Sequence, residues 1–354
     1  MQEMKLPPLS AILPWYRANR RDLPWRNTAD PYRIWLSEIM LQQTRVEAVR
    51  GYYTRFLEAL PDVAALAAVS DERLLKLWEG LGYYSRARNL KKAANVIMSA
   101  HGGVFPRDYQ AVLALPGIGE YTAGAICSFA FGLPYPAVDG NVLRVAARLL
   151  DFDGDILDTK NKRLLTAAVA AAQPADEAGD FNQAMIELGA VVCLPNGAPK
   201  CGECPLADCC AARAAGRESH LPVRRKPAPR KKEARTVLIL RVGDRVAIRK
   251  RPETGLLSGL FEPFCLTGTK TLDELRAWLA ARGITPLYLT PLEPSRHIFT
   301  HIEWEMQGFE AILAPEGAEA LCAALCDGLY LAPREEIDRA FAIPSAYRAY
   351  RPYM

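Results

Sequence analysis

The hydrophobic pattern changes period partway along this chain, and that change constrains the fold more than any other feature. Up to residue 221, apolar residues recur at helical spacing in short segments separated by glycine and proline. After residue 235, β-branched runs at Thr236–Val242 and Arg245–Arg249 flank the turn residues Gly243 and Asp244, which predicts a hairpin. The 354 residues are enough for about two domains. The sequence therefore predicts an all-α domain followed by an α+β domain.

The individual elements follow from the same patterns. The predicted helices of the first domain are 32–43, 46–60, 71–79, 86–100, 107–114, 121–131, 140–150, 161–172 and 181–192. In the second domain we expect a helix at Leu272–Ala281 and a strand at Ile302–Glu310, because the latter alternates with aromatic residues.

Residues 222–235 separate the two predicted domains, 1–221 and 236–354. This segment combines three prolines with seven basic residues and one acidic residue, which is typical of a solvated linker. Its net charge of 7 − 1 = +6 exceeds that of the whole chain, 44 − 40 = +4. The basic linker is therefore a candidate contact for a polyanion, although the total charge alone does not identify one.

The chain lacks the features of membrane and secreted proteins. No segment reaches the ~18 apolar residues of a membrane span. The N-terminus has no apolar core followed by a cleavage site, so it does not read as a signal peptide. We expect an intracellular protein.

Five of the nine cysteines lie between residues 193 and 210. In a reducing compartment such a dense group indicates metal binding rather than disulfides. Cys193, Cys201, Cys204 and Cys210 are separated by seven, two and five residues, and Cys209 is left as a spare. Four closely spaced thiolates bind zinc or an iron–sulfur cluster, and the spacing alone does not decide between them.

A turn with two glycines, Gly117 and Gly119, leads into a predicted helix within Leu115–Ala123. Glycine permits positive φ and exposes backbone N–H groups, and the start of the next helix adds partial positive charge. The arrangement suits a nucleic-acid phosphate and matches the helix-hairpin-helix motif of DNA-binding proteins. A plain connection between helices is the alternative.

Two carboxylates stand out near this motif. Asp139 immediately precedes the predicted helix 140–150, where an ordinary N-cap is the simplest role. Glu38 interrupts an otherwise apolar helical segment that includes Trp35 and Met40. A place on a solvated helix face is the alternative there. However, a desolvated carboxyl has a raised pKa and can act as a general acid near neutral pH.

These motifs together resemble the helix-hairpin-helix DNA glycosylases, and residues 1–221 are most similar to the adenine DNA glycosylase (MutY) family. The similarity covers nearly the whole first domain. The motifs that carry it are Asp22–Arg26, Trp35–Thr44, Gly80–Asn89, Leu115–Ala123, Tyr135–Arg144 and Phe181–Met185.

The resemblance implies a role for each motif residue. Glu38 would protonate adenine, Asp139 would stabilise the sugar oxocarbenium ion, and Tyr121 and Asn141 would orient this centre. The adenine pocket would comprise Leu23, Trp25, Arg26 and Gln183, with a core role as the alternative for Trp25. Gln43 and Tyr83 would enter or support the base stack beside the lesion; for Tyr83, too, a core role is the alternative.

Two further implications concern lyase activity and the cofactor. Position 121 is tyrosine where bifunctional relatives carry a Schiff-base lysine, so we expect a monofunctional glycosylase. The family places a 4Fe-4S cluster on cysteines with six residues in the first gap, and this chain has seven, Leu194 to Lys200. A loop with Pro195 and Gly197 can absorb the extra residue, and family spacing favours Cys210 over Cys209.

The second domain resembles the Nudix-like domain of the same family. Gly255–Glu262 matches its start, and Phe299, Thr300 and His301 match its lesion-recognition loop. No Arg-Glu-x-x-Glu-Glu run follows Gly259, so we expect this domain to bind rather than hydrolyse. The structural alternative is that Phe299–His301 simply ends a strand and packs against Trp304.

The expected function is excision of adenine opposite 8-oxoguanine or guanine in double-stranded DNA, by a cytoplasmic, nucleoid-associated monomer. One alternative is a thymine-glycol or mismatch glycosylase of the same fold. Another is a non-catalytic DNA-binding module whose cluster supports folding, although the pair Glu38 and Asp139 argues against it.

Overall fold

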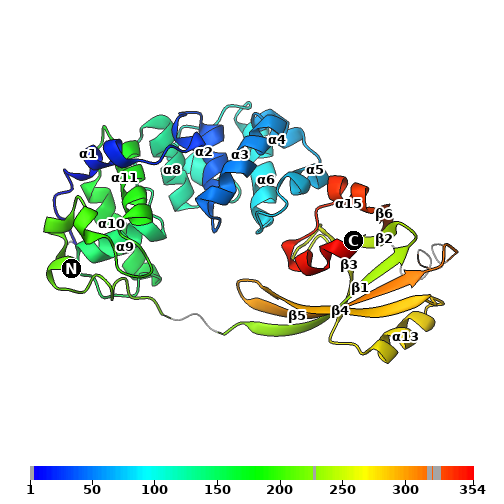
Figure 1. Cartoon of the computed structure of the whole chain (residues 1–354). Helices are drawn as coiled ribbons and strands as arrows, with labels where there is room; N and C mark the ends of the chain where they lie inside the picture. The colour runs from blue at the N-terminus through cyan, green and yellow to red at the C-terminus, as the bar shows by residue number, and fades with distance from the viewer. Residues whose placement is uncertain (1–3, 226–228, 317–320, 322–327) are drawn as a thin grey trace. The chain divides into compact units, whose positions relative to one another are not determined.

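The computed structural model describes residues 4–225, 229–316, 321 and 328–354. The chain divides into two compact units, Met1–Ala68 with Arg88–Lys226, and Val69–Ala87 with Pro227–Met354. Figure 1 shows helices along the first part of the chain and a sheet in the last third. The predicted fold class is confirmed. No helix among the described residues is long and apolar enough to cross a membrane.

The helical part begins before the first predicted helix. Its helices are α1 Ile12–Asn19, η1 Pro24–Arg26, α2 Pro31–Leu41, α3 Val46–Ala59, α4 Val63–Ala68, α5 Asp71–Leu77, α6 Ser85–Ala100, α7 Tyr109–Leu113, α8 Glu120–Phe131, α9 Gly140–Leu149, α10 Thr159–Ala172, α11 Ala178–Val191, η2 Cys201–Glu203, η3 Ala207–Cys209 and α12 Ala211–Ala214. The nine predicted helices are confirmed, with end points shifted by a few residues. The sequence patterns missed α1, α4 and the short α12.

Side-chain caps set where several of these helices begin. Asp30 accepts a hydrogen bond from the backbone N–H of Tyr32 and starts α2, with Pro31 in the first turn. Asp139 caps α9 in the same way, and Gly132, with φ of 67°, ends α8. The residues at these positions therefore determine where the helices begin and end.

One hydrophobic core of the first unit lies where α1, α9, α10 and α11 meet. It includes Ile12, Val142, Leu165 and Leu188, and four of the clustered cysteines pack against its edge. α11 also packs on α8, and α8 packs on α2. α8 and α11 therefore connect this core to the helix that carries Glu38.

The second unit contains a six-stranded mixed sheet in the order β4-β5-β1-β3-β2-β6. Its elements are β1 Lys231–Val242, β2 Arg245–Lys250, β3 Phe261–Thr267, α13 Leu272–Ala280, β4 Tyr288–Ile298, β5 Ile302–Leu313, β6 Leu329–Pro333, α15 Arg334–Ala340 and η4 Ser345–Tyr353. The predicted hairpin, helix and β5 strand are confirmed. β1 and β5 pair in parallel, and the other pairings are antiparallel.

Alternation along β1 gives the sheet two buried faces. Val237 and Ile239 face a core shared with Ile337 and Tyr347 of the C-terminal helices, whereas Leu238 and Leu240 face a core shared with α13. Figure 1 accordingly shows α13 on one side of the strands and the C-terminal helices on the other.

The predicted linker requires a correction, and one segment of the first predicted domain groups with the second unit. β1 begins at Lys231, so residues 231–235, predicted as linker, are strand residues paired with β5. In addition, residues 69–87 group with the second unit. Within that unit, Lys76 donates to the Phe341 carbonyl at 3.0 Å, and the Ile343 N–H donates to Glu79 at 2.9 Å.

Candidate active site

A cavity of about 760 Å³ opens in the first unit between α2, α8, α11 and the start of α9. This volume lies within the range of small-molecule sites. Nine residues predicted for the site line it together: Leu23, Trp25, Arg26, Glu38, Gln43, Tyr121, Asp139, Asn141 and Gln183. The fold thus gathers motifs that are far apart in the sequence into one site.

Glu38 is the acidic group most removed from water in this cavity wall. Only 6% of the residue is exposed, and Tyr121 donates a hydrogen bond to its Oε2 at 2.7 Å. Burial raises the pKa of Glu38 to about 7; the Tyr121 bond and the charge of Arg26 act in the opposite direction, and the charge of Asp139 reinforces the rise. Glu38 can therefore carry a proton near neutral pH, as a general acid requires.

Asp139 acts as the N-cap of α9 and also lines the cavity. Its Oδ1 accepts from the backbone N–H groups of Asn141 and Val142 at 2.8 and 2.9 Å, and its Oδ2 accepts from Asn141 Nδ2 at 2.7 Å. Burial raises the pKa of Asp139, whereas these three bonds lower it. The N-cap that the sequence offered as the simplest role is thus confirmed, and it is compatible with a place in the cavity lining. Its carboxylate is held rigidly beside Glu38.

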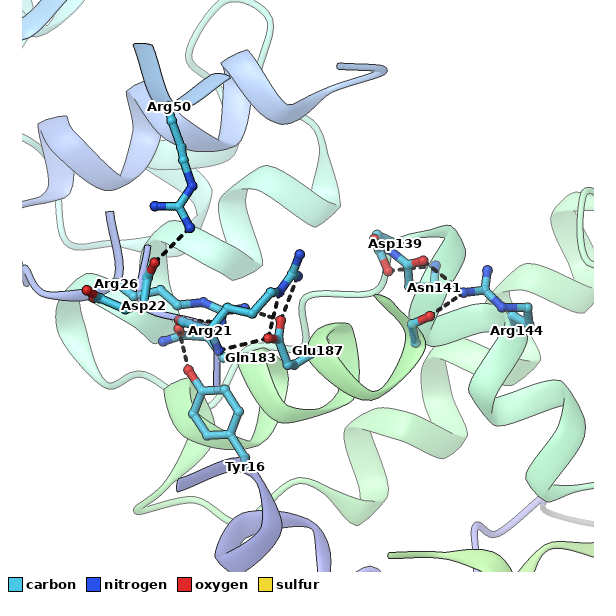
Figure 2. A network of polar contacts seen from close by, with 11 residues as sticks. Tyr16, Arg21, Asp22, Arg26, Arg50, Asp139, Asn141, Arg144, Gln183 and Glu187 are labelled. Atoms are coloured by element: carbon cyan, nitrogen blue, oxygen red, sulfur yellow. Dashed lines mark hydrogen bonds and ion pairs between the residues drawn. The ribbon is translucent and has the colours of Figure 1, made fainter. Parts of the chain in front are cut away.

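A second polar network forms another wall of the cavity, and the sequence patterns did not single it out (Figure 2). The carboxylate of Glu187, on α11, accepts hydrogen bonds from Arg21 and Arg26. Next to it, the hydroxyl of Tyr16 donates to Gln183 Oε1 at 2.8 Å. Glu187 interrupts an apolar stretch of α11 just as Glu38 interrupts α2, so the same signal was available for it.

The apolar members of the predicted pocket serve both the core and the cavity. Leu23 and Trp25 are 2% and 6% exposed, and the Trp25 ring meets the Tyr53 ring edge-on at 5.4 Å between centroids. A residue can therefore fill the core with one side and shape the cavity with the other. The two readings of Trp25 are compatible.

The glycine turn lies between α7 and α8, outside the cavity lining. Gly117 has φ of 78°, and a Cβ there would lie 2.6 Å from Asn89 Cβ, so the fold itself requires glycine. Gly119 is the N-cap of α8 with φ of −104°, and a Cβ there would meet no atom within 4 Å. The packing of the described residues therefore does not require glycine at 119.

The four predicted cysteine ligands surround one small cavity. Cys193, Cys201, Cys204 and Cys210 all line it, together with Arg148. The guanidinium of Arg148 donates to the Cys193 sulfur at 3.1 Å and to the Leu194 carbonyl at 2.9 Å. This lining of four sulfurs and a buried cation fits a cluster with anionic thiolate ligands.

Cys209 lies apart from that lining. Its sulfur is directed at the carbonyl oxygens of Leu206 and Pro8, at 3.4 and 3.8 Å. The geometry thus distinguishes it from the neighbouring Cys210. Among the described residues, no three His, Cys, Asp or Glu side chains are arranged to hold a single metal ion.

The remaining predicted residues lie in the second unit, apart from Gln43. Phe299, Thr300 and His301 form the turn between β4 and β5, and the Phe299 ring packs against Trp304 at 4.9 Å between centroids. Thr300 and His301 are exposed, and the Thr300 hydroxyl lies 3.2 Å from the hydroxyl of Tyr83. Phe299 therefore anchors the turn while its two polar neighbours face outward.

Gln43 and Tyr83 share an unusual backbone. Their φ values are 58° and 47°, in the left-handed region that residues other than glycine rarely adopt. Such strain persists where the surrounding structure imposes it, and it concentrates at ligand-binding sites. The two residues predicted to enter the base stack are thus both held in strained conformations.

Both parts of the chain match models of known protein families. Residues 36–170 match the model of the HhH-GPD superfamily of base excision DNA repair proteins, and residues 236–351 match the NUDIX domain model. The adenine DNA glycosylase of Buchnera aphidicola subsp. Baizongia pistaciae is 34% identical over 293 residues, which cover 82% of each chain. The human adenine DNA glycosylase is 35% identical over 371 residues, covering 87% of this chain and 67% of the human one.

Solved structures resemble the helical part. A thermostable thymine-DNA glycosylase matches 58% of this chain and 94% of its own, with a TM-score of 0.52 and 31% identity. Endonuclease III in a non-covalent complex with DNA matches 59% and 94%, with a TM-score of 0.51 and 26% identity. These two structures thus match a smaller share of this chain than the adenine DNA glycosylases do.

Proposed function

The chain belongs to the adenine DNA glycosylase family, and on that premise we propose that it hydrolyses the N-glycosidic bond of adenine mispaired with 8-oxoguanine or guanine in double-stranded DNA. The observation that carries the proposal is the placement of Glu38, Tyr121 and Asp139 in one cavity. The base is inaccessible within the stack, so it must be flipped into this cavity.

In the proposed reaction the proton and the electron pair take separate routes. Protonated Glu38 gives its proton to N7 of the flipped adenine, and the electron pair of the C1′–N9 bond leaves with the neutral base. The sugar becomes an oxocarbenium ion, which the Asp139 carboxylate stabilises. Water adds its hydroxyl to C1′, and its proton restores the carboxyl of Glu38.

We propose that the enzyme is monofunctional, without robust lyase activity. Position 121 carries a phenol, whose pKa is raised well above its usual value, chiefly by burial, and which donates a hydrogen bond to Glu38. It provides no amine for a Schiff base. Lys162 also lines the cavity, so borohydride trapping should be compared between wild type and Lys162→Ala; a stoichiometric adduct during base release in either protein would contradict the assignment.

We propose that Cys193, Cys201, Cys204 and Cys210 hold a 4Fe-4S cluster, which would cross-link the 193–210 loop and supply a one-electron redox centre. Their shared cavity and the separate orientation of Cys209 support this ligand set. Iron and sulfide analysis tests it. Cys209→Ser should retain the cluster absorbance and Cys210→Ser should lose it. The reverse result would make Cys209, rather than Cys210, the fourth ligand.

We propose that Thr300 and His301 read the base opposite adenine. 8-Oxoguanine differs from guanine in the added carbonyl oxygen and the N7 hydrogen, which a hydroxyl and an imidazole can hydrogen-bond. The exposure of both side chains and the contact of Thr300 with Tyr83 support this role. The protein would act as a monomer in the nucleoid.

Base release from defined duplexes tests the function against both alternatives. Adenine opposite 8-oxoguanine and opposite guanine should be released, whereas adenine opposite thymine should remain. Release of thymine from a mismatch would favour the thymine-specific alternative. Binding without any base release, in cluster-loaded protein, would favour the non-catalytic alternative.

A further inference from the structure

Glu187 carries a permanent negative charge behind the wall of the active-site cavity. Its side chain is fully buried, and it accepts hydrogen bonds from Arg21 Nε and Nη2 at 2.8 Å and from Arg26 Nη2 at 2.6 Å. Burial acts to raise the pKa of Glu187, but the bonds from the two arginines outweigh it and lower the pKa to about 2. Glu187 is therefore ionised at every pH at which the enzyme would work.

The two guanidinium groups that Glu187 holds belong to the cavity itself. Arg21 and Arg26 both line it, and the side chain of Arg26 is only 8% exposed. A second contact, from Arg26 Nη1 to the Arg21 carbonyl at 3.2 Å, fixes the same orientation. Figure 2 shows both guanidinium groups directed at the Glu187 carboxylate. One carboxylate thus restrains two cations.

Glu38 faces charged or titratable groups from every side of the cavity. Tyr121 approaches from α8, Asp139 from the start of α9, and Arg26 from η1. The other cations of the lining are Arg21, Arg45 and Lys162. Arg26 is the cation whose charge already acts on Glu38, because it lowers the pKa of that carboxyl. Burial and the Tyr121 bond act more strongly on Glu38, but Arg26 is the charge that would act more strongly if it moved toward Glu38.

We propose that Glu187 is a positioning residue that holds Arg21 and Arg26 on the cavity wall, so that neither guanidinium pairs with Glu38 and the Glu38 carboxyl keeps its proton. A guanidinium without its carboxylate, in a cavity with two other carboxyls, would pair with one of them. A cation within about 4–6 Å typically lowers a carboxyl pKa by about 1–3 units. The inference rests on the proposed function, because the proton matters only if Glu38 is the general acid.

The decisive variant is Glu187→Gln, which keeps the size of the side chain and one acceptor oxygen but removes the charge. Single-turnover adenine release would be measured from about pH 5 to pH 9. The wild-type rate should fall as pH rises through about 7, where Glu38 loses its proton. In Glu187→Gln this alkaline limb should move to lower pH by about one unit or more.

A double variant separates positioning from a purely structural role. Glu187→Gln with Arg26→Met also removes one of the two released cations, the one whose charge already acts on Glu38, so the limb should return toward its wild-type pH even if the rate stays low. Glu177→Gln is the matched control, because Glu177 forms an exposed ion pair with Arg17 just before α11. It should leave the profile unchanged.

The outcomes distinguish this inference from the proposed function. If Glu38→Gln retains the rate and the limb, Glu38 is not the acid and both proposals fail. If the alkaline limb depends on Glu38 but stays at the same pH in Glu187→Gln, only the positioning role of Glu187 is overturned. A fall in the rate of Glu187→Gln by the same factor at all pH values would overturn that role as well. Should Glu187→Gln fail to fold, Arg26→Met alone must move the limb to higher pH, and an unmoved limb overturns the inference.

Discussion

Each unit buries one glutamate between two arginines, and the two clusters differ in what lies beside them. Glu187 restrains Arg21 and Arg26, which line the cavity that contains Glu38. In the second unit Glu262, 1% exposed, accepts hydrogen bonds from Arg249, Arg251 and Tyr347, and Tyr347 belongs to a hydrophobic core.

This comparison shows that a buried ion cluster does not by itself identify a functional site. The charges are alike, and Arg26 and Arg251 each lie over an aromatic ring. However, Arg21 and Arg26 also line a cavity with two further carboxyls. We therefore expect loss of Glu262 to reduce stability and loss of Glu187 to alter chemistry.

The largest expected effect is on the rate, at the carboxyls of the cavity. Glu38→Gln and Asp139→Asn should each slow single-turnover adenine release by about 100-fold or more, because general-acid and electrostatic contributions are of that order. Binding to the lesion duplex should remain, since phosphate contacts dominate affinity. A variant that keeps more than about a tenth of the rate would remove that residue from the proposed chemistry.

The next effect is on stability, and it tests the comparison directly. Glu262→Gln should lower the free energy of unfolding by about 3 kcal/mol, because it removes the buried member of the ion cluster and leaves two partly buried arginines without their partner. The midpoint of urea unfolding measures this, and Glu305→Gln, in an exposed pair with Lys232, is the control with less than ~1 kcal/mol expected. Folded Glu262→Gln protein should excise adenine with the wild-type pH profile; a shifted profile would show that this cluster, too, reaches the chemistry.

A smaller effect is expected on the choice of mispair. Thr300→Ala with His301→Ala should reduce the preference for adenine opposite 8-oxoguanine over adenine opposite guanine by about tenfold, which corresponds to one polar contact of ~1.4 kcal/mol. Thr290→Ala, at the exposed far end of β4, should leave that preference unchanged. Substitution is a cleaner test than truncation, because residues 69–87 group with the second unit. If the double variant keeps the wild-type preference, the 8-oxoguanine must be recognised by residues other than Thr300 and His301.

The smallest expected effect is at the glycine turn. Gly119→Ala should weaken DNA binding by a few-fold and reduce its salt dependence, without loss of stability, because a Cβ there meets no protein atom but would stand before a phosphate. Gly51→Ala on α3 is the matched control and should bind normally. Unchanged affinity of Gly119→Ala would favour a plain connection between α7 and α8.

The two carboxylates of the cavity stand out in the sequence by local chemistry, whereas the other predicted lining residues came from the family resemblance. Glu38 is conspicuous within an apolar helix, and Asp139 stands just before one. Glu187 carries the same signal but was missed, because its meaning depends on Arg21 and Arg26, more than 160 positions away. Long-range pairing of this kind has no signature in a local pattern.

The missed strands have an equally physical explanation. β3 contains Pro263, and β4 contains Pro291 and Pro294, although proline normally argues against a strand because it cannot donate a ladder hydrogen bond. β4 tolerates its prolines at the edge of the sheet, with a shift in register between Leu292 and Ser295. Residues 231–235 likewise became strand because β5 offered a partner along their whole length.

The same edge strand has a consequence for how copies of this protein meet one another. β4 lies at one end of the sheet, where an unpaired backbone could recruit a strand from a second molecule. Pro291 and Pro294 remove two donors from that edge, and Glu293 between them adds an exposed charge. The strand that leads into the Phe299–His301 turn is thus poorly suited to intermolecular β-pairing, so the turn can stay exposed without promoting aggregation.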